Sequence, residues 1–142
     1  MIEIDQSMLD AYNREMEKFH ALRKDVVECN KRVGEEYPSP NIPDMLSSLQ
    51  KKHGKRRVAM FFANQVNGAP WDGRYSKATK EWASKQLPIP QHPYSLNNAS
   101  LLRKPPGELS IDMHPIVIDG FACCIIKVER EARAKRRSNR SR

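Results

Sequence analysis

The chain has 142 residues, of which 39% are hydrophobic and 30% are charged, and its formal net charge is +8. This length fits one domain that can bury a core without disulfides or metals. No apolar run approaches the ~20 residues that a membrane span needs, and the N-terminus does not read as a secretory signal. The three cysteines form no C-x-x-C pair. We therefore expect a soluble cytoplasmic protein with reduced thiols.

The positive charge is concentrated in two segments of the chain. Residues 51–107 carry eleven Lys/Arg and two acids, and residues 127–142 carry eight Lys/Arg and two acids. Residues 1–50 carry six Lys/Arg and ten acids. This polarity favours an acidic partner, which can be DNA, RNA, a nucleoprotein or an acidic protein face. A solvated basic surface without a partner would have the same composition.

The first element is predicted to be one long amphipathic helix. Apolar residues recur every three or four positions from Met8 to Val33, which is the stripe of an α-helix. The run Tyr37-Pro38-Ser39-Pro40 ends it. At ~1.5 Å per residue such a helix spans roughly 42 Å. We expect it to project beyond the core or to pair with a second copy of the chain.

Two shorter helices are predicted in the middle of the chain. The first opens at Pro43, because proline favours the first helical turn, and ends at Gly54. The second follows the N-cap residue Ser76, runs to about Gln86 and turns Trp82 inward.

Residues 56–66 fit helical spacing and strand alternation equally well, and their length and two alanines favour a helix. The connection from Leu87 to Gly107 contains five of the ten prolines, and a short strand is expected near residues 108–112. A last helix opens at His114-Pro115, with a buried stripe from Ile116 to Val128.

The expected fold is therefore mainly α, with α+β as the alternative if residues 56–62 and 108–112 form strands. Residues 1–128 are expected to make one globular domain. Within it, residues 1–37 form the long helix and residues 38–128 form the compact part. Residues 129–142 are basic and have few apolar contacts to offer, so a disordered tail is expected there.

Several short motifs occur together between residues 50 and 127. They are Gly54-Lys55-Arg56-Arg57-Val58, Ala63-Asn64, Asp72-Gly73-Arg74-Tyr75-Ser76, Trp82-Ala83 and Asp112-Met113-His114-Pro115. In this combination the chain resembles an uncharacterised family, a domain of unknown function of gut Gram-positive bacteria and their conjugative elements and phages. The chain departs from the family pattern where Ile116 stands in place of a glycine after His114-Pro115, and where Phe61-Phe62 replace aliphatic residues.

The resemblance implies a mobile genetic element as the context of the protein. It implies no established activity and no catalytic residues. Small accessory proteins of such elements often inhibit host defences, including CRISPR effectors, or bind DNA, so an anti-defence role follows by association alone.

The candidate partner-binding residues are the basic residues of the central segment. They are Lys51, Lys52, Lys55, Arg56, Arg57, Arg74, Lys77, Lys80 and Lys85, with Arg103 and Lys104 further along the same segment. We expect them to converge on one surface that meets phosphates with little reading of bases.

The loop formed by Trp71, Asp72, Gly73, Arg74 and Tyr75 has two interpretations. In the first, Arg74 clamps a phosphate or carboxylate while Trp71 and Tyr75 stack on bases. In the second, Asp72 and Arg74 hold the turn together while Trp71 and Trp82 anchor it to the core, which is the more common role of conspicuous turn residues.

Catalysis has little support in the sequence. Asp112 beside His114 would suit a general base, but no nucleophile accompanies them, and a helix-capping role is simpler. No Cys/His pair has metal-ligand spacing and no glycine-rich nucleotide motif occurs, so we expect no metal and no cofactor.

The favoured function is that of a non-enzymatic accessory protein of a phage or mobile element. It would bind a nucleic acid or a nucleoprotein, such as a CRISPR effector complex. The alternative is a protein-interaction or oligomerisation module that works through the N-terminal helix.

Overall fold

The structure is a computed structural model that describes residues 6–68, 73–87, 89–90 and 109–140. Within these ranges the secondary structure is helical, and none of the residues described is in a strand. The helices are α1 (Gln6–Glu36), α2 (Ile42–His53), α3 (Lys55–Asn67), α4 (Lys77–Lys85) and α5 (Pro115–Arg140).

The expected mainly α class is confirmed. The segment 56–66 is a helix, because its apolar side chains on every side meet other helices. A strand at 108–112 was the wrong expectation for the residues described there, since 109–112 pair with no other segment as a strand.

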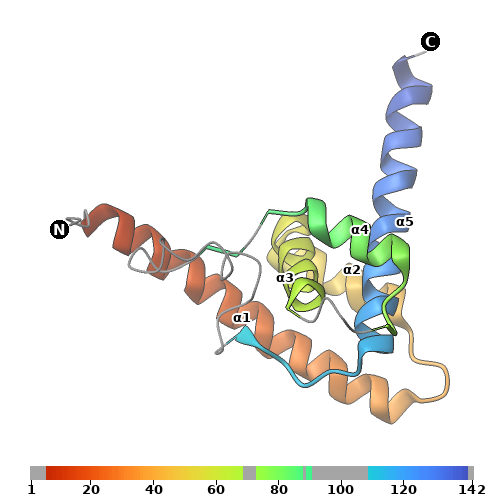
Figure 1. Cartoon of the computed structure of the whole chain (residues 1–142), viewed down its shortest axis with the longest axis horizontal. Coiled ribbons are helices and arrows are strands. Elements are labelled where there is room, and N and C mark those ends of the chain that lie inside the picture. Colours follow the sequence, from red (N-terminus) through yellow and green to blue (C-terminus); the bar gives the residue numbers. More distant parts are fainter. Residues whose placement is uncertain (1–5, 69–72, 88, 91–108, 141–142) are drawn as a thin grey trace.

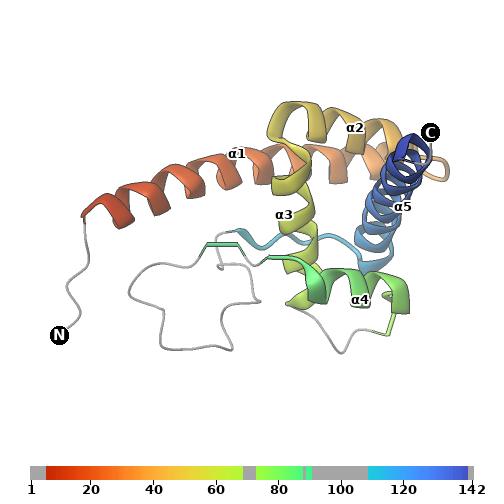
Figure 2. The ribbon, with the colours of Figure 1, turned by 90° about the horizontal axis from the view of Figure 1, so that it is seen from above.

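Helix α3 lies in the middle of the molecule and contacts each of the other four helices, with α2 and α4 at its two ends (Figure 2). Its buried residues include Val58, Phe61, Phe62 and Val66. The ring of Phe62 stacks on Phe121 of α5 with 4.9 Å between the centroids. Burial of each such ring contributes roughly 1.5–3 kcal/mol, so this pair fixes α5 against α3.

The joint between α2 and α3 is Gly54, with φ of +90°. Residues with a Cβ rarely adopt this backbone conformation, which glycine adopts without strain. The Gly54 N–H donates to the carbonyl of Gln50 at 2.9 Å and ends α2 as predicted. Lys55 then begins α3 at once, which brings the basic residues of both helices together.

Helix α1 is longer than the core that it covers. Its buried residues begin at Met16 and end at Val33. The first turns have no buried residue, and Met8 is 52% exposed. This end of α1 reaches past α3 (Figures 1 and 2), as the expected length of the helix required.

Helix α5 begins at Pro115 and buries Ile118, Phe121 and Ile125. The expectation that Ile116 belongs to this buried stripe was wrong, because Ile116 is 62% exposed. It precedes Ile118 by two residues, which places it about 200° around the helix.

The C-terminal part of α5 differs from the expected disordered tail. Residues 129–140 continue the helix and form an arm that rises beyond the other helices (Figure 1); residues 141–142 lie outside the described residues. The arm is rich in Ala, Arg, Lys and Glu, which favour helix without any tertiary contact.

Among the residues described, no helix combines the length and the apolar character that crossing a membrane demands.

Candidate functional site

The basic residues at the α2–α3 joint divide into paired and unpaired groups. Lys52 Nζ lies 2.9 Å from Asp25 Oδ2, and Arg57 Nη2 lies 3.3 Å from Glu15 Oε2. The Arg57 guanidinium also covers the Phe19 ring, 5.7 Å from its centroid. These two cations hold α1 against the joint, so their charge is largely neutralised by the acids of α1.

Asp25 is a structural anion in this cluster. His53, whose side chain is only 7% exposed, approaches the same carboxylate with Nε2 at 2.6 Å. Hydrogen bonds from Lys52 and His53 lower the pKa of Asp25 below its ordinary value. The carboxylate therefore stays ionised and binds α2 to α1.

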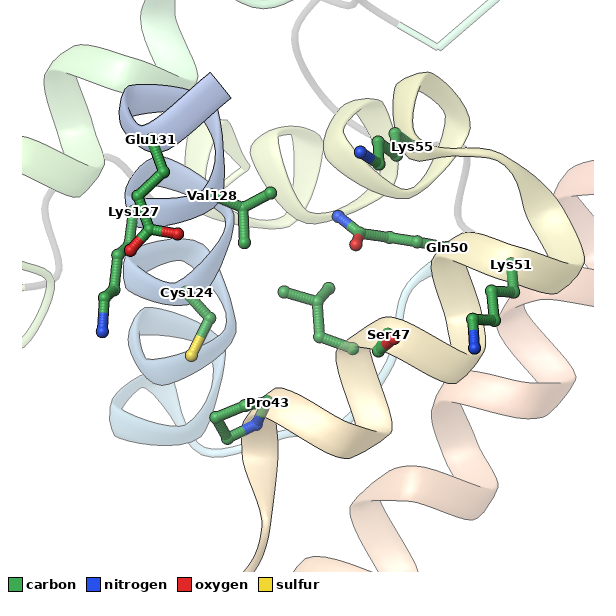
Figure 3. A pocket seen from close by; sticks show the side chains of 10 residues that line it. Pro43, Ser47, Gln50, Lys51, Lys55, Cys124, Lys127, Val128 and Glu131 are labelled. Carbon is green, nitrogen blue, oxygen red and sulfur yellow. The ribbon is translucent and has the colours of Figure 1, made fainter. Parts of the chain in front are cut away.

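Lys51 and Lys55 form the unpaired group. Among the residues described, neither makes an ion pair, and both are exposed. They border a groove between α2 and α5, where Lys127 of α5 stands on the other side (Figure 3). The groove therefore joins a part of the central basic segment to the basic C-terminal segment.

The arm of α5 continues this cationic surface away from the core. Between residues 130 and 137 the exposed basic residues are Arg130, Arg133, Lys135, Arg136 and Arg137. Glu131 is the only acid in that stretch of the sequence. The arm thus presents cations on most sides of a helix that no other helix covers (Figure 1).

The described part of the Asp-Gly-Arg-Tyr-Ser motif has structural roles. Tyr75 is buried, with 5% of its surface exposed, so its ring is not available for base stacking, and this burial favours the second interpretation of the loop. Arg74 Nη1 lies 2.8 Å from His114 Nε2, which connects the turn to the start of α5. Trp71 and Asp72 lie outside the described residues.

Ser76 of this motif makes several hydrogen bonds. Its hydroxyl accepts from the Thr79 N–H at 3.2 Å and caps α4. Its own N–H donates to Asp119 Oδ1 at 3.1 Å, and the Thr79 hydroxyl donates to the same oxygen at 2.6 Å. Burial raises the pKa of Asp119, but the hydrogen bonds from Thr79 and Ser76 outweigh it and leave the pKa lowered. The motif therefore ties α4 to α5.

The lysines of α4 do not belong to the groove. Lys77, Lys80 and Lys85 lie on a helix that covers another side of α5 from α2 (Figure 2). Arg56 is exposed at the α2–α3 joint and lines a hollow facing α1 with Glu15 and Phe19. The expectation that the central basic residues converge on one surface was therefore wrong, because they lie on different helices and two of them pair with α1. Arg103 and Lys104 lie outside the described residues.

His114 takes part in the start of α5. Its ring Nδ1 accepts from the Ile116 N–H at 3.2 Å, and its carbonyl accepts from the Val117 N–H at 2.9 Å. A neutral imidazole has one acceptor nitrogen, so His114 accepts either from Ile116 or from Arg74 at any moment. The backbone carbonyl of Asp112 accepts from the side chain of Asn30 at 3.3 Å. Asp112 and His114, which were considered as a general-base pair, thus both make hydrogen bonds that stabilise the local fold.

Among the residues described, no three His, Cys, Asp or Glu side chains lie close enough together to hold a metal ion.

The groove is the feature that sequence reasoning missed. A signal was present, because Cys124, Lys127, Val128 and Glu131 follow the i, i+3, i+4, i+7 spacing of one helix face. That face lies beside the buried stripe of α5. The spacing of apolar residues alone does not distinguish the two faces.

The chain matches a protein family over residues 6–131. It belongs to the family described as "Protein of unknown function (DUF3849)". The match covers α1 to α4 and most of α5, and the arm beyond residue 131 lies outside it. No curated protein and no solved structure matches the chain.

Proposed function

We propose that this member of the DUF3849 family is a non-enzymatic protein that binds a nucleic acid or a nucleoprotein. The observation that carries the proposal is the basic arm of α5. It stands clear of the core (Figure 1), and its Arg130, Arg133, Lys135 and Arg136 are exposed. A helix that carries cations on most sides neutralises phosphates without reading bases, so affinity with little sequence preference is expected.

The experiment compares two triple variants of equal charge. Arg130→Gln, Arg133→Gln and Arg136→Gln neutralise the arm, and Lys77→Gln, Lys80→Gln and Lys85→Gln neutralise α4. Glutamine keeps the helix propensity of the residues that it replaces. Binding is measured by fluorescence anisotropy with labelled duplex DNA and labelled single-stranded RNA.

The arm variant is expected to bind at least about tenfold more weakly than the wild type, and the α4 variant to stay close to it. Equal losses in the two variants would mean that net charge alone, without the arm, accounts for binding. Unchanged binding by the arm variant would refute the proposal.

The target of this protein is, in the same proposal, a host defence nucleoprotein such as a CRISPR effector complex. The support is the motif resemblance to proteins of conjugative elements and phages. DNA cleavage by a purified effector from the same host should slow when the wild-type protein is added. Equal rates of cleavage in the presence of the wild type and of the arm variant would refute this choice of target.

A second candidate function is self-association through the N-terminal end of α1. Met8 is 52% exposed, and no residue between Gln6 and Glu15 is buried. Light scattering over a range of protein concentrations tests it. A dimer that Met8→Glu converts to a monomer would support this function, and a wild-type monomer at all concentrations would exclude it.

A further inference from the structure

The groove between α2 and α5 combines an apolar floor with room for a ligand group. Its volume is about 580 Å³, which falls within the roughly 300–1,000 Å³ of typical ligand sites. The apolar residues that line it are Pro43, Leu46, Cys124 and Val128. Val128 is half-buried at the end of the α5 core stripe, so the floor is continuous with the hydrophobic core.

The rim of the groove is mostly cationic. Lys51 comes from α2, Lys55 from α3 and Lys127 from α5, and Glu131 is the one acid that lines the groove (Figure 3). The neighbouring Lys52 and Arg57 are paired with acids of α1, whereas no such pair satisfies the three rim lysines among the residues described. The rim therefore has a net positive charge that attracts carboxylates.

The apolar floor and the cationic rim together determine which kind of ligand fits the groove. A phosphodiester backbone satisfies the lysines but offers nothing to the apolar floor. The groove is partly open to solvent, so an extended acyl chain would remain partly hydrated there. A peptide segment with one large apolar side chain between carboxylates satisfies both features, since buried apolar anchors surrounded by polar contacts carry most binding energy at protein interfaces.

We propose that this groove docks an acidic segment of a partner protein. One large apolar side chain of the segment enters between α2 and α5 and contacts Leu46 and Val128. Its flanking carboxylates meet Lys51, Lys55 and Lys127. This site stands independently of nucleic-acid binding by the arm, because the arm beyond Glu131 takes no part in the groove.

A phage-displayed library of random linear peptides, selected on the full-length protein, tests the proposal. Ser47→Trp fills the groove from an exposed position of α2 that lines it. Ser48→Trp is the matched control, because Ser48 is also exposed but lines a different hollow, beside Asp25 and Cys29. Circular dichroism shows whether both variants fold as the wild type does.

Selected peptides are expected to carry Asp or Glu on both sides of one Leu, Phe, Met or Trp. Their Kd should rise at least about tenfold, which corresponds to ~1.4 kcal/mol, in Ser47→Trp and in the triple variant Lys51→Gln, Lys55→Gln and Lys127→Gln. It should not change in Ser48→Trp or in the arm variant Arg130→Gln, Arg133→Gln and Arg136→Gln.

Several results would overturn the docking site. Peptides that lack this pattern, or that bind Ser47→Trp as well as the wild type, would do so, as would a selection that yields no binder. Weaker binding of duplex DNA to Ser47→Trp, but not to Ser48→Trp, would assign the groove to nucleic acid instead. Loss of DNA binding in the arm variant alone bears on the proposed function and leaves the peptide result unaffected.

Discussion

Asp119 receives hydrogen bonds from the Ser76 N–H and the Thr79 hydroxyl, which come from the first turn of α4. These donors are half-buried or buried, so they lose their partner if the carboxylate is removed. A buried donor without a partner costs about 1–3 kcal/mol. We therefore expect Asp119→Ala to lower the free energy of unfolding by roughly that amount, measured by urea denaturation. The exposed Asp10→Asn serves as control, with an expected change within about 0.5 kcal/mol.

The same residue predicts how stability depends on pH. The pKa of Asp119 is lowered in the folded state, so the unfolded chain takes up the proton first as the pH falls. Its contribution to stability is complete well above the unfolded value of ~3.9 and declines as the pH drops through the lower folded pKa. Asp25, whose pKa is also lowered, acts in the same direction.

The free energy of unfolding is thus expected to fall below about pH 5, and less steeply in Asp119→Asn than in the wild type. Urea denaturation over a pH series measures both curves. Parallel curves for the two proteins would contradict the structural role of this carboxylate.

Substitution of two glycines by alanine should have opposite effects on stability. Gly54 has φ of +90°, whereas Gly120 lies within α5 and a Cβ there would meet no atom within 4 Å. We expect Gly54→Ala to destabilise the protein by about 1–3 kcal/mol and Gly120→Ala to stabilise it by roughly 0.4–1 kcal/mol. Thermal unfolding followed by circular dichroism compares them, and a lower Tm for Gly120→Ala than for Gly54→Ala would be inconsistent with this fold.

At the residue scale the sequence predicts caps better than contacts. Ser76 and Gly54 were identified because capping depends on residues a few positions away. The partner of Ser76, by contrast, is Asp119, 43 residues further along the chain, and no local pattern reveals such a pair. For the same reason the sequence left base stacking open as one of two roles for Tyr75, since its burial depends on helices distant in sequence.

At the scale of elements, the arm of α5 depends on its own residues more than on packing. Its apolar stripe ends at Val128, and at the base of the arm the indole Nε1 of Trp82 in α4 donates to Glu129 Oε2 at 3.1 Å. Removal of residues 132–142 should therefore change the free energy of unfolding by less than about 0.5 kcal/mol, although helical circular dichroism should fall.

The measurement for this prediction is urea denaturation of the truncated and full-length chains side by side. A large loss of stability on truncation would mean that the arm packs on the core in a way that this structure does not contain.

Sequence patterns identify helices by the side chains that they bury. This rule predicted α1, whose apolar positions recur at helical spacing. It failed for residues 129–140, where no such stripe exists. There the helix follows from propensity and from acid–base spacings of four residues, Glu129 to Arg133 and Glu131 to Lys135.

At the scale of the whole molecule, the distribution of charge decides what the surface can bind. Asp25 and Glu15 of α1 pair with Lys52 and Arg57, and the rest of the central positive charge lies on other surfaces. The sequence shows that positive charge is concentrated in two segments, but not that Lys51 and Lys55 lie across a groove from Lys127. That arrangement depends on how α2 packs against α5, which residues far apart in the chain determine.

The dependence of nucleic-acid binding on salt tests the central claim most directly. Between about 50 mM and about 200 mM salt, the slope of log Kd against log salt concentration counts the phosphates that the protein neutralises, at ~0.9 per contact on duplex DNA. We expect a steep slope for the wild type, and one smaller by roughly 2–3 for Arg130→Gln, Arg133→Gln and Arg136→Gln. Equal slopes for the two proteins, or no binding at the lower salt concentration, would contradict a cationic arm that binds nucleic acid.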